Sequence, residues 1–198
     1  MNDLIAPYGG ELADLFADAA RVAELKESAL SMPSCDVTPR QQSDLDLLMS
    51  GAYSPLRGFM RQADYARVLK EMRLSDGTFW PMPITLDIGE APAGKVAAGQ
   101  SLALRDLEGV LLAVLHIEDI WRPDRAAEAQ ALYGTVDPAH PGVAQLLHKT
   151  QPVYVGGRVE GVEAVVHHSF TDLRHSPAEL RHQFAKRGWV QVAAFHTA

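Results

Sequence analysis

The C-terminal stretch constrains the fold more than any other part of this sequence. Residues 176–179 (Ser-Pro-Ala-Glu) form a capping box with proline at the first helical position, and the helix that they predict ends at Gly188. Residues 189–195 (Trp-Val-Gln-Val-Ala-Ala-Phe) then have the β-branched and aromatic content of a strand covered on both faces. A helix that leads into such a strand is typical of the opening of an α/β unit.

The sequence before residue 166 predicts a mixed, mostly β domain. Residues 101–104 and 110–117 flank a Gly-containing loop and predict a hairpin. Residues 153–155 and 158–166 flank Gly156-Gly157 and predict a second extended pair, with a turn at the two glycines. Short strands without a regular alternation of strand and helix favour a small barrel or a folded sheet.

Helices are expected at three places before these strands. Residues 11–30 are rich in Ala, Leu and Glu, which favours a helix. Ser43 and the acidic residues after it predict a short helix over 44–51, which Gly51 can close. Residues 60–72 carry one apolar stripe at helical spacing.

The composition limits the partners that the protein can have. The 198 residues are 47% apolar and 22% charged, as in ordinary globular proteins. The net charge of -7 argues against nucleic acid as a partner, because neutralising phosphates needs a basic surplus. No apolar run approaches the about 20 residues of a membrane-spanning helix, and no secretory signal is visible. With Cys35 as its single cysteine, the chain cannot form an internal disulfide, and we expect it in the cytoplasm.

Several conspicuous motifs have structural interpretations. Gly156-Gly157 lacks the lysine and the following helix of a phosphate-binding loop, and Ser54-Pro55-Leu56 lacks the base that a catalytic serine needs. No metal site is expected at the four histidines near the C-terminus, since no cysteines accompany them: His167, His168, His175 and His182. Five cations fit a solvated face, with a docking surface or a contact to nucleotide phosphates as the alternative: Arg57, Arg61, Arg67, Lys70 and Arg73.

Four long motifs resemble the N-terminal part of the ATP sulfurylase (sulfate adenylyltransferase) family. They are GAYSPLRGFM (51–60), LSDGTFWPMPITLDI (74–88), GTVDPAHPGV (134–143) and WVQVAAFHTA (189–198). The resemblance implies a PUA-like β-barrel domain with flanking helices over residues 1–166. It also implies that residues 167–198 provide the first helix and strand of a Rossmann-type nucleotidyltransferase domain. We therefore expect the chain to be a fragment of a longer protein.

The same resemblance points to a site at the end of the predicted strand. In the family this strand ends in a Gln-x-Arg-Asn-Pro signature, which places His196 at the glutamine, Thr197 at the second position and Ala198 at the arginine. All three are expected to bind sulfate or ATP, and Thr197 is the expected catalytic residue. Strand ends and helix N-termini suit anions, but alanine cannot replace a guanidinium.

The implied function is the formation of adenylyl sulfate and pyrophosphate from ATP and sulfate, with Mg²⁺ accompanying ATP in the full-length enzyme. The fragment alone is expected to be inactive, to bind no cofactor and to need the rest of the catalytic domain as its partner. A homo-oligomer is expected, since family members are commonly oligomeric. The alternatives are a stand-alone PUA-like module that binds RNA, which the acidic balance disfavours, and a protein-interaction or scaffold domain.

Overall fold

Two long antiparallel strands, β5 (Leu111–Trp121) and β6 (Val153–Gly161), form the centre of the fold. The computed structural model describes residues 4–195. Its six strands pair in the order β1-β4-β5-β6-β2, and β3 also pairs with β6. All pairs are antiparallel except β1 with β4, and no pairing among the described strands closes this path into a barrel. The shorter strands are β1 (Ser34–Asp36), β2 (Gly58–Phe59), β3 (Leu86–Ile88) and β4 (Ser101–Arg105).

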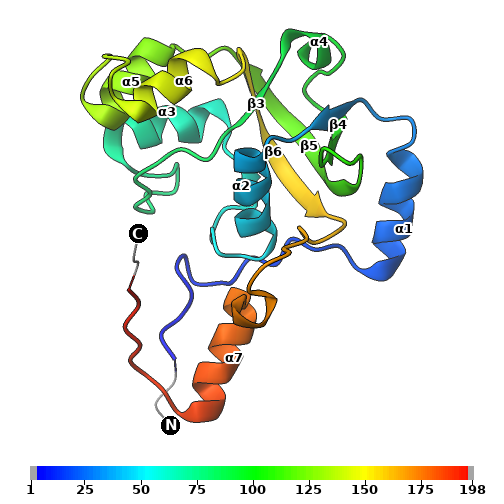
Figure 1. Ribbon diagram of the computed structural model, residues 1–198, viewed down its shortest axis with the longest axis vertical. Helices are drawn as coiled ribbons and strands as arrows, with labels where there is room; N and C mark the ends of the chain where they lie inside the picture. The colour runs from blue at the N-terminus through cyan, green and yellow to red at the C-terminus, as the bar shows by residue number, and fades with distance from the viewer. Residues whose placement is uncertain (1–3, 196–198) are drawn as a thin grey trace.

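Both faces of the sheet are buried, which explains the unbroken apolar run at the start of β5. On β4, Leu102 and Leu104 contribute to a large core with α2 (Pro39–Met49) and α3 (Gln62–Glu71). Ala103 points to the opposite face and packs in a smaller core with Leu25 of α1 (Ala19–Ser28). Figure 1 shows α1 at one side of the molecule, with α3, α5 (Arg125–Tyr133) and α6 (Pro141–His148) gathered at the other.

The predicted hairpin is confirmed, and the predicted turn at Gly156-Gly157 is wrong. β4 and β5 pair antiparallel around the predicted loop. The two glycines instead lie inside the continuous strand β6. These positions need glycine, because neighbouring backbone comes too close for a side chain. A Cβ on Gly156 would lie 2.2 Å from the carbonyl oxygen of Met60, and one on Gly157 would lie 2.0 Å from that of His116. The glycines therefore permit close backbone packing.

The first two predicted helices exist with different bounds. α1 begins only at Ala19, where the Asp18 carboxylate accepts a hydrogen bond from the Arg21 N–H at 2.8 Å. Residues 11–17 are not helical, and the Ala17 N–H donates to the carbonyl of Gly161. α2 begins earlier than predicted, at Pro39, because Thr38 and Gln41 form a capping box. α3 is confirmed within its predicted range.

Two helices between β5 and β6 have no counterpart among the sequence predictions. Asp124 caps α5 through hydrogen bonds from two backbone N–H groups, and the ring of His140 caps α6. Residues 134–143, one of the four motifs named above, form the turn between α5 and α6 and the first residues of α6. Gly142 packs so closely against Tyr133 that a Cβ would lie 2.7 Å from the ring, which gives this motif a structural role.

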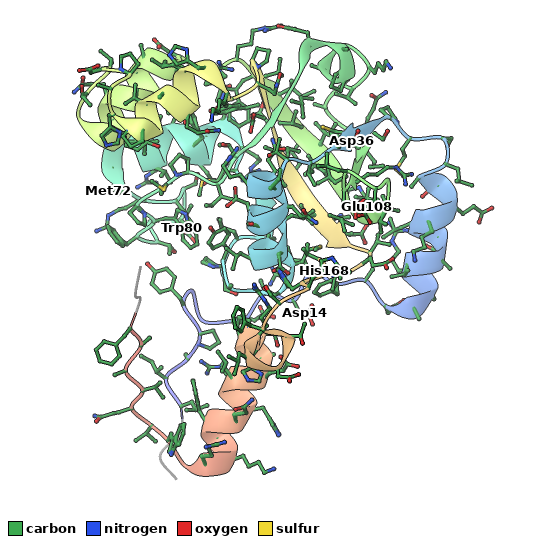
Figure 2. All side chains as sticks on the ribbon, in the orientation of Figure 1. Asp14, Asp36, Met72, Trp80, Glu108 and His168 are labelled. Carbon is green, nitrogen blue, oxygen red and sulfur yellow. The ribbon has the colours of Figure 1, made fainter. Side chains whose placement is uncertain are left out.

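The remaining elements are α4 (Glu90–Ala93), the 3₁₀ helix η1 (Thr171–Leu173) and α7 (Pro177–Arg187). After α3, the segment that contains Met72 and Trp80 folds back on itself, and Trp80 N–H donates to the Met72 carbonyl at 2.8 Å (Figure 2). No helix among the described residues is both long and apolar enough to cross a membrane.

Candidate functional site

The C-terminal helix has the capping that its sequence predicts. The Ser176 hydroxyl accepts from the Glu179 N–H at 3.2 Å, and the Glu179 carboxylate accepts from the Ser176 N–H at 2.7 Å. Gly188 ends the helix in the left-handed conformation with φ of 68°. No residue of α7 is buried, and Figure 1 shows the helix extending away from the sheet. α7 therefore forms without a core of its own.

Residues 189–195 do not form the predicted buried strand. They are extended but pair with no described strand, and their large side chains are exposed, with Phe195 at 89%. Trp189 packs on Phe184 with the ring centroids 6.3 Å apart, and the Arg187 guanidinium lies 4.8 Å from the Trp189 ring. A strand needs hydrogen-bonding neighbours, and residues 4–188 offer none to this segment.

The predicted substrate-binding residues His196, Thr197 and Ala198 lie outside the described residues. The catalytic role of Thr197 and the anion contacts of His196 therefore stay predictions. The segment that leads to them is exposed, and the clefts described below are lined by other parts of the chain.

A cleft of about 630 Å³ lies beside the edge strand β1. Asp87 lines this cleft and is 5% exposed. Its carboxylate accepts hydrogen bonds from Arg40 at 2.6 Å, from Gln41 at 2.8 Å and from the Gln151 N–H at 2.7 Å. Cys35 also lines the cleft, and burial raises the pKa of its thiol to about 11. At neutral pH this cysteine is therefore a thiol and a poor nucleophile.

A second hydrogen-bond network surrounds Glu128 of α5. The carboxylate is 3% exposed and accepts from the hydroxyl of Tyr65 at 2.9 Å and from that of Tyr154 at 3.0 Å. Burial raises the pKa of Glu128, against the opposing effect of these hydrogen bonds. Burial also raises the pKa of both tyrosines, so their hydroxyls remain donors.

Glu128 borders a cavity of about 260 Å³, which we call the tyrosine cavity. Its lining comes from α2, α5, α6, the start of β6 and residues 82–85. Figure 1 shows α5 and α6 together at one side of the molecule. The charged, hydroxyl-bearing and aromatic side chains that matter chemically are Arg40, Asp44, Tyr53, Thr85, Glu128, Tyr133 and Tyr154.

A third network lies on the β4–β5–β6 surface under α1. The Ser101 hydroxyl lies 3.1 Å from Nδ1 of His116, and Nε2 of His116 lies 2.5 Å from the Glu160 carboxylate. Arg21 donates two hydrogen bonds to Glu160, at 3.1 and 2.9 Å. Although serine, histidine and glutamate are adjacent, none of the clefts described here is lined by them, and the network joins α1 to the sheet.

Ser54 and the five cations of residues 57–73 fit their structural interpretations. Ser54 is buried in a turn, where its hydroxyl donates to the Gly51 carbonyl at 2.6 Å. His167 lies 3.1 Å from Asp46, and no group of three or more metal-ligating side chains occurs among residues 4–195. Each of the five cations between residues 57 and 73 contacts a partner at the protein surface, as expected for a solvated face. The pairs are Arg57 with Glu11, Arg61 with Glu118, Arg67 and Lys70 with Glu71, and Arg73 with the Gly77 carbonyl.

Sequence reasoning missed Asp87, Glu128, His116 and Glu160. The available signal is a polar residue inside an apolar run. Asp87 lies between Leu86 and Ile88, and His116 lies between Leu115 and Ile117. Glu128 gives no such signal, because an acidic residue near a helix start is ordinary.

Comparisons with known proteins place these features in a family. A family model described as a PUA-like domain matches residues 5–164. A sulfate adenylyltransferase of Aspergillus fumigatus is 46% identical over 195 residues, which are 96% of this chain and 34% of that protein. A probable bifunctional SAT/APS kinase of Sorangium cellulosum is 43% identical over 194 residues, with 98% and 33% covered.

A solved structure described as a hexameric APS kinase from Thiobacillus denitrificans matches with a TM-score of 0.75 and 40% identity. The match covers 94% of this chain and 32% of that one. The chain thus spans about a third of the length of the curated relatives it matches.

Proposed function

Because the chain belongs to the PUA-like domain family and shares 43–46% of its residues with sulfate adenylyltransferases over almost its whole length, we propose that it forms the N-terminal part of such an enzyme. The identity over 96–98% of the chain is the observation that carries this proposal. It extends through α7 and the extended segment after it, beyond the PUA-like domain itself.

The proposal divides the chain at about residue 166. Residues 1–166 form the PUA-like domain, and residues 167–198 open a Rossmann-type catalytic domain. The match of the family model, which ends at residue 164, supports this boundary, as does the absence of buried residues in α7. The exposed, uncharged segment 189–195 then becomes an interior strand when its neighbours are present.

The reaction that we propose for the whole protein transfers an adenylyl group. A sulfate oxygen forms a bond with the α-phosphorus of ATP, the bond from that phosphorus to the β-phosphate oxygen breaks, and pyrophosphate leaves. Two anions must approach each other, so hydrogen-bond donors that offset the developing charge are the main requirement. In this proposal, a ring nitrogen of His196 and the hydroxyl of Thr197 are such donors. Ala198 supplies none, so another residue must provide the arginine function.

Magnesium accompanies ATP in the proposed reaction and neutralises phosphate charge when it is bound. Among residues 4–195 no group of three or more His, Cys, Asp or Glu side chains could hold a metal ion. We assign these residues no step in which the metal takes part.

The proposal is tested first with the chain alone. Without the other two thirds of the enzyme, we expect no pyrophosphate release from ATP and sulfate. Measurable release by the purified chain would contradict the division of the site proposed here.

A chimaera provides the positive test. This chain replaces the matching third of the Aspergillus fumigatus sulfate adenylyltransferase, and pyrophosphate release is measured. We expect the chimaera to be active. Combining His196→Gln with Ala198→Arg in the chimaera should raise its rate about tenfold or more, because the double substitution restores an oxyanion donor. Glu108→Gln, in the exposed β4–β5 loop, is the matched control. A folded but inactive chimaera contradicts the function, and an unchanged rate in the double variant contradicts the site.

We also propose that the whole protein is a cytoplasmic homo-oligomer. The likeness to a chain described as hexameric supports an oligomer, and the single cysteine supports a reducing compartment. Light scattering on the chimaera and on the chain alone tests whether assembly needs the remainder of the protein.

A further inference from the structure

The tyrosine cavity contains a buried carboxylate without an ion-pair partner. Two carboxylates of the described core are almost fully buried, Asp87 at 5% and Glu128 at 3% exposed. Asp87 forms an ion pair with Arg40 at 2.6 Å. Among residues 4–195, Glu128 has no such partner, and its direct hydrogen bonds come from the neutral hydroxyls of two tyrosines. Arg40 and Arg125 act on it only through longer-range attraction.

A buried charge of this kind needs either a proton or a cation. Without a cation, burial raises the pKa of Glu128 and favours its protonated form. Asp44, on the same cavity, also has a raised pKa because of burial, although Arg40 lies 3.1 Å away. A cation inside the cavity would offset both effects.

Other groups on the cavity wall can bind the rest of an organic cation. Thr85 is 7% exposed and lines the cavity. Its hydroxyl makes no hydrogen bond within the described residues, so it can accept a hydrogen bond from a ligand or donate one to it. Tyr53 and Tyr133 also line the cavity, and aromatic rings attract cations through the ring face. Arg40 also lines the cavity, but its guanidinium is already paired with Asp44 at 3.1 Å and with Asp87 at 2.6 Å. An anion would therefore meet two carboxylates and a cation that is already engaged, and is disfavoured.

We propose that the tyrosine cavity binds a compact organic cation, a primary ammonium or guanidinium group, with Glu128 as its counter-ion and Thr85 as a hydrogen-bond partner. The volume of about 260 Å³ admits a group of this size with a short carbon chain. Glu128 and Thr85 come from elements far apart in sequence, so the site exists only in the folded domain. The proposal is independent of the adenylyl transfer proposed above.

The test uses the whole chain and n-propylammonium chloride as the probe, followed by ¹H–¹⁵N and tyrosine-ring NMR shifts. We expect saturable shifts of residues around the cavity with a dissociation constant on the order of 1 mM. Potassium chloride at the same ionic strength and n-propanol at the same concentration are the matched controls, and neither is expected to reproduce the shifts.

Three variants connect the binding to the proposed residues. Glu128→Gln keeps an acceptor for the two tyrosine hydroxyls and is expected to weaken binding about tenfold or more, since it removes the charge. Thr85→Val keeps the shape of the side chain and should weaken binding several-fold. Glu108→Gln, in the exposed loop at the opposite end of β5 from α5 and α6, should change nothing (Figure 2).

Three results overturn the proposal. One is the absence of saturable shifts in the parent chain, which would mean that Glu128 is simply protonated. Another is equal binding by the parent and by folded Glu128→Gln, with folding confirmed by a thermal transition. Equal shifts with n-propanol would also count against it, because they would show an apolar cavity without charge selectivity.

Discussion

Nε2 of His116 lies 2.5 Å from Oε2 of Glu160, and the same carboxylate accepts two hydrogen bonds from Arg21. His116 and Glu160 lie on the adjacent strands β5 and β6, whereas Arg21 lies on α1. The carboxylate therefore joins the helix to the sheet through charged groups, at the edge of the small core around Leu25.

Glu160→Gln should weaken the attachment of α1. The hydrogen bonds from Arg21, and secondly those of His116, lower the pKa of Glu160 from 4.5 to about 2. Because the folded-state value lies below the unfolded one, this stabilisation is present above about pH 4.5 and is lost as the pH falls towards 2. We expect the variant to lose about 1 kcal/mol or less of unfolding free energy at pH 7. Urea titrations at pH 7 and pH 3 check this, and a loss that is equal at both pH values contradicts it.

Cys35 should be unreactive at neutral pH. Burial raises the pKa of its thiol to about 11, with Asp36 and Asp87 adding smaller effects. Its reaction with a disulfide reagent should be slow at pH 7 and should accelerate as the pH rises towards 11. Stopping the reaction at intervals and counting modified chains by mass spectrometry gives the rate, with free cysteine as the control. Rapid modification at pH 7 would contradict this assignment.

Gly156→Ala should destabilise the domain severely. The added methyl group would lie 2.2 Å from the carbonyl oxygen of Met60, so β6 and the segment after β2 would have to separate. We expect a loss of about 3 kcal/mol or more, or failure to fold. Gly94→Ala is the matched control, since its Cβ would lie no closer than 3.5 Å to any atom. Similar thermal midpoints for the two variants would contradict the close packing.

Removing residues 189–198 should leave the PUA-like domain intact. The described part of this segment is exposed and pairs with no strand among residues 4–188, so it contributes little burial. We expect the thermal midpoint of the shortened chain to stay within about 2 °C of that of the full chain. A larger decrease would show that the segment packs against the domain in solution.

The chain should not bind RNA specifically. Its net charge is -7, and the arginines between residues 57 and 73 are engaged in local ion pairs or hydrogen bonds. Filter binding at low and moderate salt is expected to show no retention above that of an acidic control protein. Retention that decreases steeply with salt would favour the RNA-binding alternative.

Elements whose signals lie within a few residues of one another could be predicted from the sequence. The capping box at Ser176 and Glu179, the stop at Gly188, the stripe of α3 and the β4–β5 hairpin all agree with the structure. In each of these, the hydrogen bonds or apolar contacts join residues close in the chain, so a short window of sequence contains them. The long motifs likewise predicted the family that the comparisons show.

Other features depend on residues that are distant in the chain and become neighbours only on folding. Gly156-Gly157 continues a strand because Met60 and His116 bring their backbone against it. Residues 189–195 have the composition of a strand but pair with no strand among residues 4–188, since composition supplies propensity and only a neighbouring strand supplies hydrogen bonds. The tyrosine cavity collects Thr85, Glu128 and Tyr154 from separate elements. Burial and close backbone contact arise when these elements pack, and no local pattern encodes them.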